Sequence, residues 1–166
     1  RTWTATDECN NVNTCIQRIY IFDTTAPEVD CPAAAVTIEC TESTEPSNPA
    51  LGEPLFTDNC SNESEITSVH NDVVAQSTEC AAEKVITRTW TITDNCGNAR
   101  TCVQTINVVD NTPPLVVCPA TEITIECSDD RSTTALGEPT FTDNCSAPGA
   151  ITATSVDDEN GLTECG

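Results

Sequence analysis

Acidic side chains are the residues of this sequence best suited to chemistry. The chain of 166 residues has 27 Asp and Glu against 6 Lys and Arg, for a formal net charge of −21. Many carboxylates stand beside asparagine, in Thr-Asp-Asn-Cys and Val-Asp-Asn motifs where strands are expected to end. Calcium takes about six to eight oxygen ligands from carboxylates, amides and backbone carbonyls. Aspartate and asparagine also favour turns without any metal, so both interpretations stay open.

The predicted calcium ligands form two groups, one at each expected boundary between domains. The first group is Asp23, Asp58, Asn59, Asp94 and Asn95; the second is Asp110, Asn111, Glu39, Glu53, Asp143 and Asn144, with Glu126 as the repeat of Glu39. Carboxylates that converge at a boundary repel one another, and 6 basic residues are too few to neutralise them. A calcium ion would remove this repulsion and stiffen the joint. The sequence contains neither an EF-hand loop nor a glycine-rich nonapeptide loop.

Cysteine is the second chemically informative residue type. The 12 cysteines fall in two equivalent sets, at positions 9, 15, 31, 40, 60 and 80 and at positions 96, 102, 118, 127, 145 and 165. An even, repeated set without Cys-x-x-Cys pairs or nearby histidines favours disulfides over metal binding. Disulfides persist in oxidising environments, so we expect an extracellular or cell-surface location.

The cysteines and acids are organised by a repeated hairpin. The stretch RTWTITDNCGNARTCVQTINVVD, residues 88–110, repeats RTWTATDECNNVNTCIQRIYIFD, residues 1–23. Thr89, Thr91 and Thr93 alternate with Trp90 and Ile92, which is the period of a half-buried strand. A loop rich in Asp, Asn and Gly then leads into a returning strand. Because an isolated hairpin is marginally stable, we expect it to pack against the strands between the copies.

Short alternating segments supply those strands. We expect strands within residues 36–40, 51–60 and 66–72, and again within 123–127, 136–145 and 151–157. The spacing of the copies suits one β-sandwich domain. The sequence therefore predicts an all-β, disulfide-rich chain of tandem β-sandwich repeats. Residues 1–23 would be the last hairpin of a partial repeat, 24–110 a complete repeat, and 111–166 a partial repeat without its hairpin.

Alternating strand directions suggest how the cysteines pair. Cys31 and Cys60 are expected at one end of the sandwich, and Cys40 and Cys80 at the other. The expected pairs are 31–60, 40–80 and 9–15 in the first set, and 118–145, 127–165 and 96–102 in the second. Sequence alone leaves fifteen pairings open for six cysteines.

The chain boundaries admit two interpretations. The sequence is either a window on a longer tandem array or a subunit that joins neighbouring copies of itself head to tail. In the second case residues 1–23 complete the last repeat of the next subunit by strand addition, and the contact propagates into a filament.

Charge and composition exclude several functions. The net charge of −21 argues against nucleic-acid binding, and no apolar run is long enough for membrane insertion. The single histidine, His70, is replaced by Ser155 in the repeat, and no nucleophile, base and oxyanion hole are indicated, so we expect no enzyme activity. Asn59, Asn62 and Asn144 match the glycosylation pattern, which leaves attached glycans possible.

Three motifs carry a resemblance to a known family. Cys31-Pro32, the Asp-Asn-Cys at 58–60, and TWTITDNCGNARTC at 89–102 resemble the hyalin repeat, an immunoglobulin-like module, and the cysteine-rich tandem repeats of large bacterial surface proteins. The linker VVDNTPP at 108–114 is similar to the calcium-holding linker of cadherins. The resemblance implies an immunoglobulin-like sandwich in extracellular adhesion or as a spacer. We therefore expect a structural subunit of an extracellular fibre or stalk; the alternative is a ligand-binding adhesin or receptor module.

Overall fold

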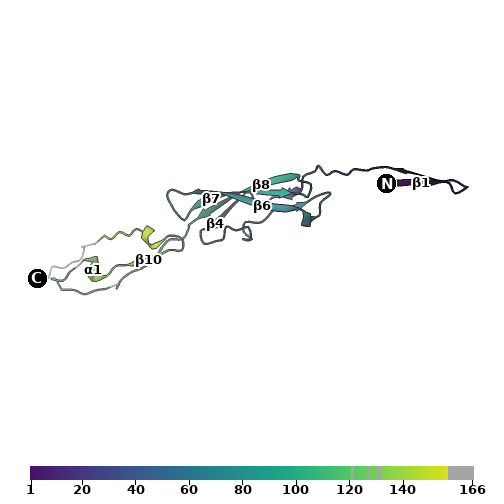
Figure 1. Cartoon of the computed structure of the whole chain (residues 1–166). Coiled ribbons are helices and arrows are strands. Elements are labelled where there is room, and N and C mark those ends of the chain that lie inside the picture. The colour runs from purple at the N-terminus through teal and green to yellow at the C-terminus, as the bar shows by residue number, and fades with distance from the viewer. Residues whose placement is uncertain (121, 127, 131, 157–166) are drawn as a thin grey trace. The chain divides into compact units, whose positions relative to one another are not determined.

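The computed structural model describes every residue except 121, 127, 131 and 157–166. In that part of the chain the fold is almost entirely β, as predicted (Figure 1). The strands in chain order are β1 (Thr2–Thr6), β2 (Val12–Ile16), β3 (Glu28–Asp30), β4 (Ala35–Glu39), β5 (Leu55–Thr57), β6 (Thr67–Gln76), β7 (Lys84–Thr93), β8 (Ala99–Val109), β9 (Leu115–Val117) and β10 (Thr140–Thr142). Three short helices accompany them, η1 (Glu63–Glu65), α1 (Thr133–Leu136) and η2 (Pro148–Ala150).

The main element of the fold is a four-stranded sheet in the order β4-β8-β7-β6 (Figure 1). Strands β7 and β8 form the predicted hairpin, closed by the backbone hydrogen bond from Asp94 N to Asn98 O at 3.1 Å. Strand β4 pairs with β8 in parallel, from Ala35 opposite Thr105 to Glu39 opposite Val109. The ends of β4 and β8 therefore lie side by side.

Alternation along β7 and β8 divides these strands into an inner and an outer face. Buried residues alternate with more exposed ones along each strand, and the buried residues contribute to two apolar clusters. The first cluster is Ile38, Leu51, Ile86, Ile106 and Val108; the second is Ile66, Trp90, Ile92 and Cys102, with Val29 and Phe56 against it. Burial of this apolar surface stabilises the sheet.

The buried face also holds two polar side chains that need hydrogen-bond partners. The amide of Gln104 donates to the backbone oxygens of Leu51 at 2.6 Å and Ala33 at 3.2 Å. The guanidinium of Arg88 donates to both carboxylate oxygens of Asp72 at 2.8 Å and to Thr44 O at 2.6 Å. These bonds replace the water that burial removes.

Two small sheets repeat one another residue for residue. In the pair β3–β5, Glu28, Val29 and Asp30 lie opposite Thr57, Phe56 and Leu55. In the pair β9–β10, Leu115, Val116 and Val117 lie opposite Thr142, Phe141 and Thr140. The two copies of this sequence thus form the same local strand pairing, with equivalent residues in register.

Some predicted strands are absent. Residues 123–126 and 151–156 are not strands, and the ends of these predictions, at 127 and 157, lie outside the described residues. Strand β4, the counterpart of 123–127, pairs with β8, and residues 111–166 contain no counterpart of β8. A segment without a pairing partner leaves its backbone groups to water. The single-turn helix α1 lies between the two segments and begins after the N-cap residue Ser132.

The predicted disulfide pairing is wrong. Cys40 is bonded to Cys145, and Cys31 and Cys102 are also disulfide-bonded. Free thiols are found at Cys9, Cys15, Cys60, Cys80, Cys96 and Cys118, which excludes the pairs 9–15, 31–60, 40–80, 96–102 and 118–145. The pair 127–165 lies outside the described residues.

Strand register explains these corrections. Cys31 follows Asp30, which lies opposite Leu55 at the start of β5, whereas Cys60 comes after the end of β5. The two cysteines therefore belong to opposite ends of this strand pair. In the hairpin, Cys102 points into the core while Cys96 is exposed at the tip, so they face different environments.

Contacts divide the chain into two compact units. One contains residues 1–30, 54–69 and 90–102, and the other contains 31–53, 70–89 and 103–166. Within the described residues, no helix is both long and apolar enough to cross a membrane. The predicted domain boundaries at residues 23 and 110 stay predictions.

Candidate metal site

Three carboxylates meet in the first of the two predicted ligand groups. Asp23 precedes β3, Asp58 follows β5, and Asp94 follows β7. One carboxylate oxygen from each lies within 4.8 Å of the others. Asp94 is buried, and Asp23 and Asp58 are half-buried. Three segments that are distant in sequence therefore bring three negative charges to one point.

Each of these aspartates is held by one oxygen in a tight turn. Asp23 Oδ1 accepts from the backbone N–H of Thr25 at 3.0 Å. Asp58 Oδ1 accepts from the N–H groups of Cys60 at 2.9 Å and Ser61 at 2.8 Å. These turns fix the carboxylate planes, because a side chain bonded to its own loop has little rotational freedom.

Asp94 is fixed in the same way. Its Oδ1 accepts from the N–H groups of Cys96 at 2.9 Å and Asn98 at 2.8 Å, and its Oδ2 accepts from the Asn98 amide at 2.8 Å. The same amide lies 3.4 Å from the backbone oxygen of Asp23. Asn98 therefore ties the hairpin turn to the segment that carries Asp23.

The second oxygens of two aspartates have no partner. Asp23 Oδ2 and Asp58 Oδ2 are buried and accept no hydrogen bond from any described residue. No Lys or Arg in that part of the chain forms a hydrogen bond or ion pair with the three carboxylates. A buried, unpaired carboxylate oxygen is unfavourable, and a cation shared by the three groups would compensate it.

The surroundings of Asp94 favour its ionised form. Burial raises the pKa of Asp94, but hydrogen bonds from Asn98, Cys96 and Gly97 outweigh it, so the pKa lies below the usual value. The site therefore keeps a charged Asp94 at neutral pH. Burial and the neighbouring charges of Asp23, Asp58, Cys96 and Asp94 raise the pKa of the Cys60 thiol.

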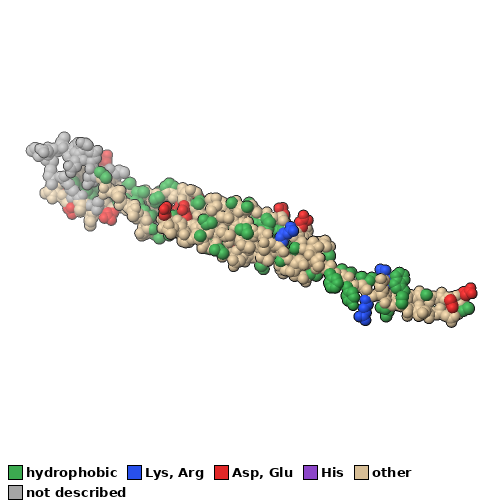
Figure 2. Space-filling model, turned by 90° about the horizontal axis from the view of Figure 1, so that it is seen from above, with side chains coloured by type: hydrophobic (Ala, Val, Ile, Leu, Met, Phe, Trp, Pro, Cys, Tyr) green, Lys and Arg blue, Asp and Glu red, His purple; other side chains and the backbone are tan. Residues whose placement is uncertain are grey.

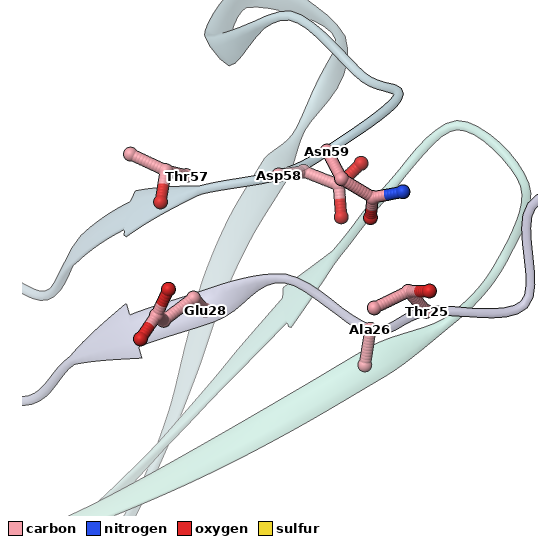
Figure 3. A pocket seen from close by; sticks show the side chains of 6 residues that line it. All are labelled: Thr25, Ala26, Glu28, Thr57, Asp58 and Asn59. Carbon is pink, nitrogen blue, oxygen red and sulfur yellow. The ribbon is translucent and has the colours of Figure 1, made fainter.

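A pocket adjoins the carboxylates on the side of Asp58. It is lined by Thr25, Ala26, Glu28, Thr57, Asp58 and Asn59, and Figure 3 shows Asp58 and Asn59 across from Thr25 and Ala26. The amide of Asn59 donates to Cys60 Sγ at 3.1 Å, and Asn95 Oδ1 accepts from the Ser61 hydroxyl at 2.8 Å. These two predicted ligands therefore have partners of their own outside the three-carboxylate cluster.

The second predicted ligand group does not assemble in the same way. Asp110 lies in a cluster with Cys40 and Cys145, and its Oδ1 accepts from Thr112 N at 3.2 Å. The carboxylate of Glu39 is bonded to Asn111, by the amide at 3.0 Å and the backbone N–H at 3.3 Å. Since the two cysteines of this cluster form a disulfide, Asp110 is its one carboxylate.

Among the described residues, the other carboxylates of the second group do not join this cluster, although the Asn144 amide lies 3.9 Å from Cys40 Sγ. Asp143 Oδ1 accepts from the N–H groups of Cys145 at 2.9 Å and Ser146 at 2.6 Å, as Asp58 does in its own turn. Asn144 donates to Cys145 Sγ at 3.1 Å. Glu53 and Glu126 are exposed and belong to no cluster of possible ligands among the described residues.

Sequence reasoning missed Asn98, which positions Asp94 and contacts Asp23. A signal was present in the repeat, because Asp7 and Asn11 occupy the equivalent places and form the same bonds, with Asn11 N to Asp7 Oδ1 at 2.8 Å and Asn11 Nδ2 to Asp7 Oδ2 at 2.7 Å. The pattern Asp-x-Cys-x-Asn was thus a structural motif and not only turn composition.

Comparison with known proteins identifies the central part of the chain. Residues 27–108 match the family model of the HYR-like domain with 4 cysteines. The chain is also 34% identical over 148 residues to hyalin of Strongylocentrotus purpuratus, a match that covers 86% of this chain and 12% of hyalin. The chain thus spans a small part of this relative. Residues 27–108 form a hyalin-repeat-like domain with an immunoglobulin-like fold.

Proposed function

We propose that this chain is a structural, adhesion-related module of an extracellular fibre or stalk, and not an enzyme. The observation that carries the proposal is the disulfide between Cys40, at the end of β4, and Cys145, which lies 105 positions later beyond the hyalin-repeat-like domain. This bridge links the domain covalently to the segment that follows it. The relative hyalin and the disulfide-bonded cysteines support an extracellular location.

A mechanical role can be tested by pulling on the chain. In the oxidised wild type the Cys40–Cys145 bond prevents the chain between these residues from being extended by force. Without this bond, in Cys145→Ser, stretching should release a longer contour length. The matched control is Cys118→Ser, which removes a free, exposed thiol. Equal contour lengths for Cys145→Ser and wild type in single-molecule force measurements would contradict a load-bearing bridge.

Calcium is the proposed second stiffening element, bound by Asp23, Asp58 and Asp94. The two buried oxygens without hydrogen-bond partners support it, because they offer negative charge at fixed positions. Calcium accepts such carboxylates in flexible geometry. A bound ion would connect the segment before β3 to the ends of β5 and β7 and restrain their relative motion.

The matched pair Asp94→Asn and Asp7→Asn tests the calcium site. Each change removes one negative charge from one of two equivalent hydrogen-bonded turns, but only Asp94 belongs to the three-carboxylate cluster. Millimolar calcium should raise the melting temperature of the wild type and of Asp7→Asn relative to chelator, by ligand linkage, and Asp94→Asn should lose most of the shift. No calcium-dependent shift in the wild type removes this part of the proposal.

Head-to-tail association of neighbouring copies is the third part of the proposed function. Residues 1–23 repeat the sequence of a hairpin that is buried elsewhere in the same chain, yet their large apolar side chains are exposed. Figure 2 shows apolar side chains gathered with basic ones on this N-terminal segment. We infer that this face packs onto residues 111–156 of a second copy, by the strand addition that β4 and β8 exemplify.

Sedimentation under reducing conditions tests this association. Ile21→Glu introduces a charge on the exposed apolar face and should reduce association, whereas Glu8→Gln at the hairpin turn should leave it unchanged. A wild type that stays monomeric at high concentration would contradict the head-to-tail arrangement.

A further inference from the structure

We propose that the free edge of β6 is a docking surface for a second copy of this chain. The β6 strand of the second copy adds to the sheet in antiparallel orientation about a two-fold axis, so that two four-stranded sheets become one continuous sheet. This lateral contact is independent of the head-to-tail association proposed above. It joins neighbouring chains sideways.

Strand β6 is a long edge strand. The sheet order β4-β8-β7-β6 gives it β7 as its one neighbouring strand among the described residues (Figure 1). Of its 10 residues only Asp72 is half-buried, and the others are exposed. Residues 70–76 lie in one compact unit with β4 and with the adjoining parts of β7 and β8. An edge strand presents backbone N–H and C=O groups that can pair with another chain.

The register of the β6–β7 hairpin shows which backbone groups of β6 point outwards. Ser77 N–H donates to Glu83 O at 3.1 Å just beyond the ends of the two strands. Counting back from this bond places Asp72 opposite Arg88, in agreement with their ion pair at 2.8 Å. In an antiparallel ladder, a strand bonds to one neighbour through every second residue. The odd-numbered residues of β6 therefore bond to β7, and the N–H and C=O groups of Asp72 and Val74 point to the free edge.

The two edges of this sheet differ in their protection. The opposite edge strand, β4, has 5 residues and ends at the acidic Glu39, and Pro32 lies three positions before its start. Short length, charge and proline are features that keep an edge strand from pairing with another chain. Strand β6 has 10 residues, no proline or lysine, and a single acid. One edge is therefore protected, and the other is able to pair.

The charge of β6 allows a second copy to approach. The chain has a net charge of −21, so most surfaces of two copies repel each other. Strand β6 contains only one of the 27 acids, Asp72, and the buried Arg88 compensates its charge at 2.8 Å. At the middle of residues 70–76, Val73 is 63% exposed and Val74 is 54% exposed. This neutral, apolar edge is a surface at which two copies can meet without strong repulsion.

A two-fold axis at Val73 satisfies the outward groups of both copies. Val73 then lies opposite Val73 of the second copy, and Asp72 of each copy lies opposite Val74 of the other. The N–H and C=O groups of Asp72 pair with those of Val74, and no carboxylate lies directly opposite another. Apolar β-branched side chains that lie opposite each other stabilise such a pair. One strand pair buries a small area, so the contact is weak for two free chains and stronger where a fibre presents many copies.

Sedimentation equilibrium of the whole chain tests this contact, with the free thiols alkylated to prevent new disulfides. The Ile21→Glu variant is used because its head-to-tail association should be reduced. At about 0.15 M salt this variant should form dimers and no larger species. At about 0.01 M salt the dimer should be about tenfold weaker or more, because the repulsion between the two acidic chains is less screened.

Two changes at the edge of β6 should disrupt the dimer in this background. Val74→Pro removes an outward N–H but no bond to β7, and edge strands accept proline at such a position. Val73→Lys introduces the charge that natural edge strands use against pairing. Each should weaken the dimer by about tenfold or more, since backbone hydrogen bonds between the copies are lost. The matched control, Val103→Lys, adds the same charge at a 55% exposed valine of the central strand β8 and should leave the dimer unchanged.

Amide hydrogen exchange locates the contact in the Ile21→Glu protein itself. Dimerisation should newly protect the N–H groups of Asp72 and Val74, whereas that of Val73, which faces β7, should already be protected in the monomer. Dimers without this new protection overturn the proposal, and so do dimers that withstand both Val74→Pro and Val73→Lys.

The lateral and head-to-tail contacts can fail separately. An Ile21→Glu protein that stays monomeric at high concentration, while the wild type associates, overturns the β6 contact and leaves head-to-tail association intact. If the wild type and Ile21→Glu both stop at the same dimer with protected Asp72 and Val74, the β6 contact is supported and head-to-tail association is contradicted.

Discussion

The hairpin β1–β2 and the hairpin β7–β8 have nearly the same turn but opposite burial. In both, an aspartate closes the turn through its Oδ1, and the fourth residue after it donates an amide to its Oδ2. The same position is left-handed in each, at Asn10 with φ 65° and Gly97 with φ 91°. The local sequence is therefore sufficient to specify this turn wherever it occurs.

Burial differs because the surroundings differ. Trp90 is 4% exposed and Trp3 is 53% exposed; Ile106 is 0% exposed and Ile19 is 54% exposed. The inner positions of β7 and β8 are covered by residues from other strands and loops. Among the described residues, no strand or loop covers the apolar side chains of residues 1–23. The same amphipathic pattern therefore has an exposed apolar face in this hairpin. A hairpin sequence thus indicates which face can be buried, and the rest of the domain decides whether it is.

The largest expected effect comes from truncating the two equivalent tryptophans. Trp90→Ala should lower the free energy of unfolding by about 3–5 kcal/mol, because it removes a buried aromatic side chain and leaves a cavity. Trp3→Ala should change it by less than about 1 kcal/mol in dilute protein, because Trp3 is exposed. Urea unfolding of both variants measures the difference.

The tryptophan pair also tests the association of copies. If residues 1–23 pack onto a second copy, Trp3→Ala should become destabilising as the protein concentration rises, while the cost of Trp90→Ala stays constant. Equal costs for the two variants in dilute protein would mean that the N-terminal hairpin is already covered within one chain.

The next-largest effect on stability is expected at Arg88. Its counterpart in the first hairpin, Arg1, is exposed and lies 5.5 Å from the centre of the Trp3 ring. Arg88 is buried and paired with Asp72 at 2.8 Å. Asp72→Asn should cost about 3 kcal/mol at neutral pH, since removing one partner of a buried ion pair leaves the other charge uncompensated.

The same pair predicts a pH dependence. The hydrogen bond from Arg88 lowers the pKa of Asp72 below 3.8, against the opposing effect of burial, with further lowering by the charges of Arg88 and His70. The stabilisation is therefore present above the unfolded-state pKa, near 4, and is lost as the pH falls through the folded-state pKa. The difference in unfolding free energy between wild type and Asp72→Asn should shrink below about pH 4. A difference that is constant from pH 7 to pH 2 would argue against the ion pair.

The smallest effect is expected at the left-handed turn position. Gly97→Ala should destabilise by about 1 kcal/mol, because φ is 91° and alanine is strained there although no atom lies within 4 Å of the added methyl group. Asn10→Gly should be nearly neutral, because asparagine and glycine both tolerate this conformation. Thermal unfolding checks both changes, and a neutral Gly97→Ala would show that the turn relaxes.

Much of the fold could be predicted from local patterns. The hairpin at 88–110, the strand β4 and the class of the fold followed from alternation and turn composition, and they are confirmed. Three of the predicted ligands, Asp23, Asp58 and Asp94, are brought together. The pairing of the cysteines could not be predicted, because each bond depends on strand register and on the face that a residue occupies. The spacing of cysteines in the sequence contains no information on either.

The sequence by itself determined the turns and the two faces of each strand, because hydrogen bonds within five residues and alternation of side chains are local properties. Tertiary structure decided what those faces meet. It placed Gln104 and Arg88 in the interior with partners up to 71 positions away, joined Cys40 to Cys145, and left two carboxylate oxygens buried without partners. These outcomes depend on strand order and register, which are set when the whole apolar surface is buried at once.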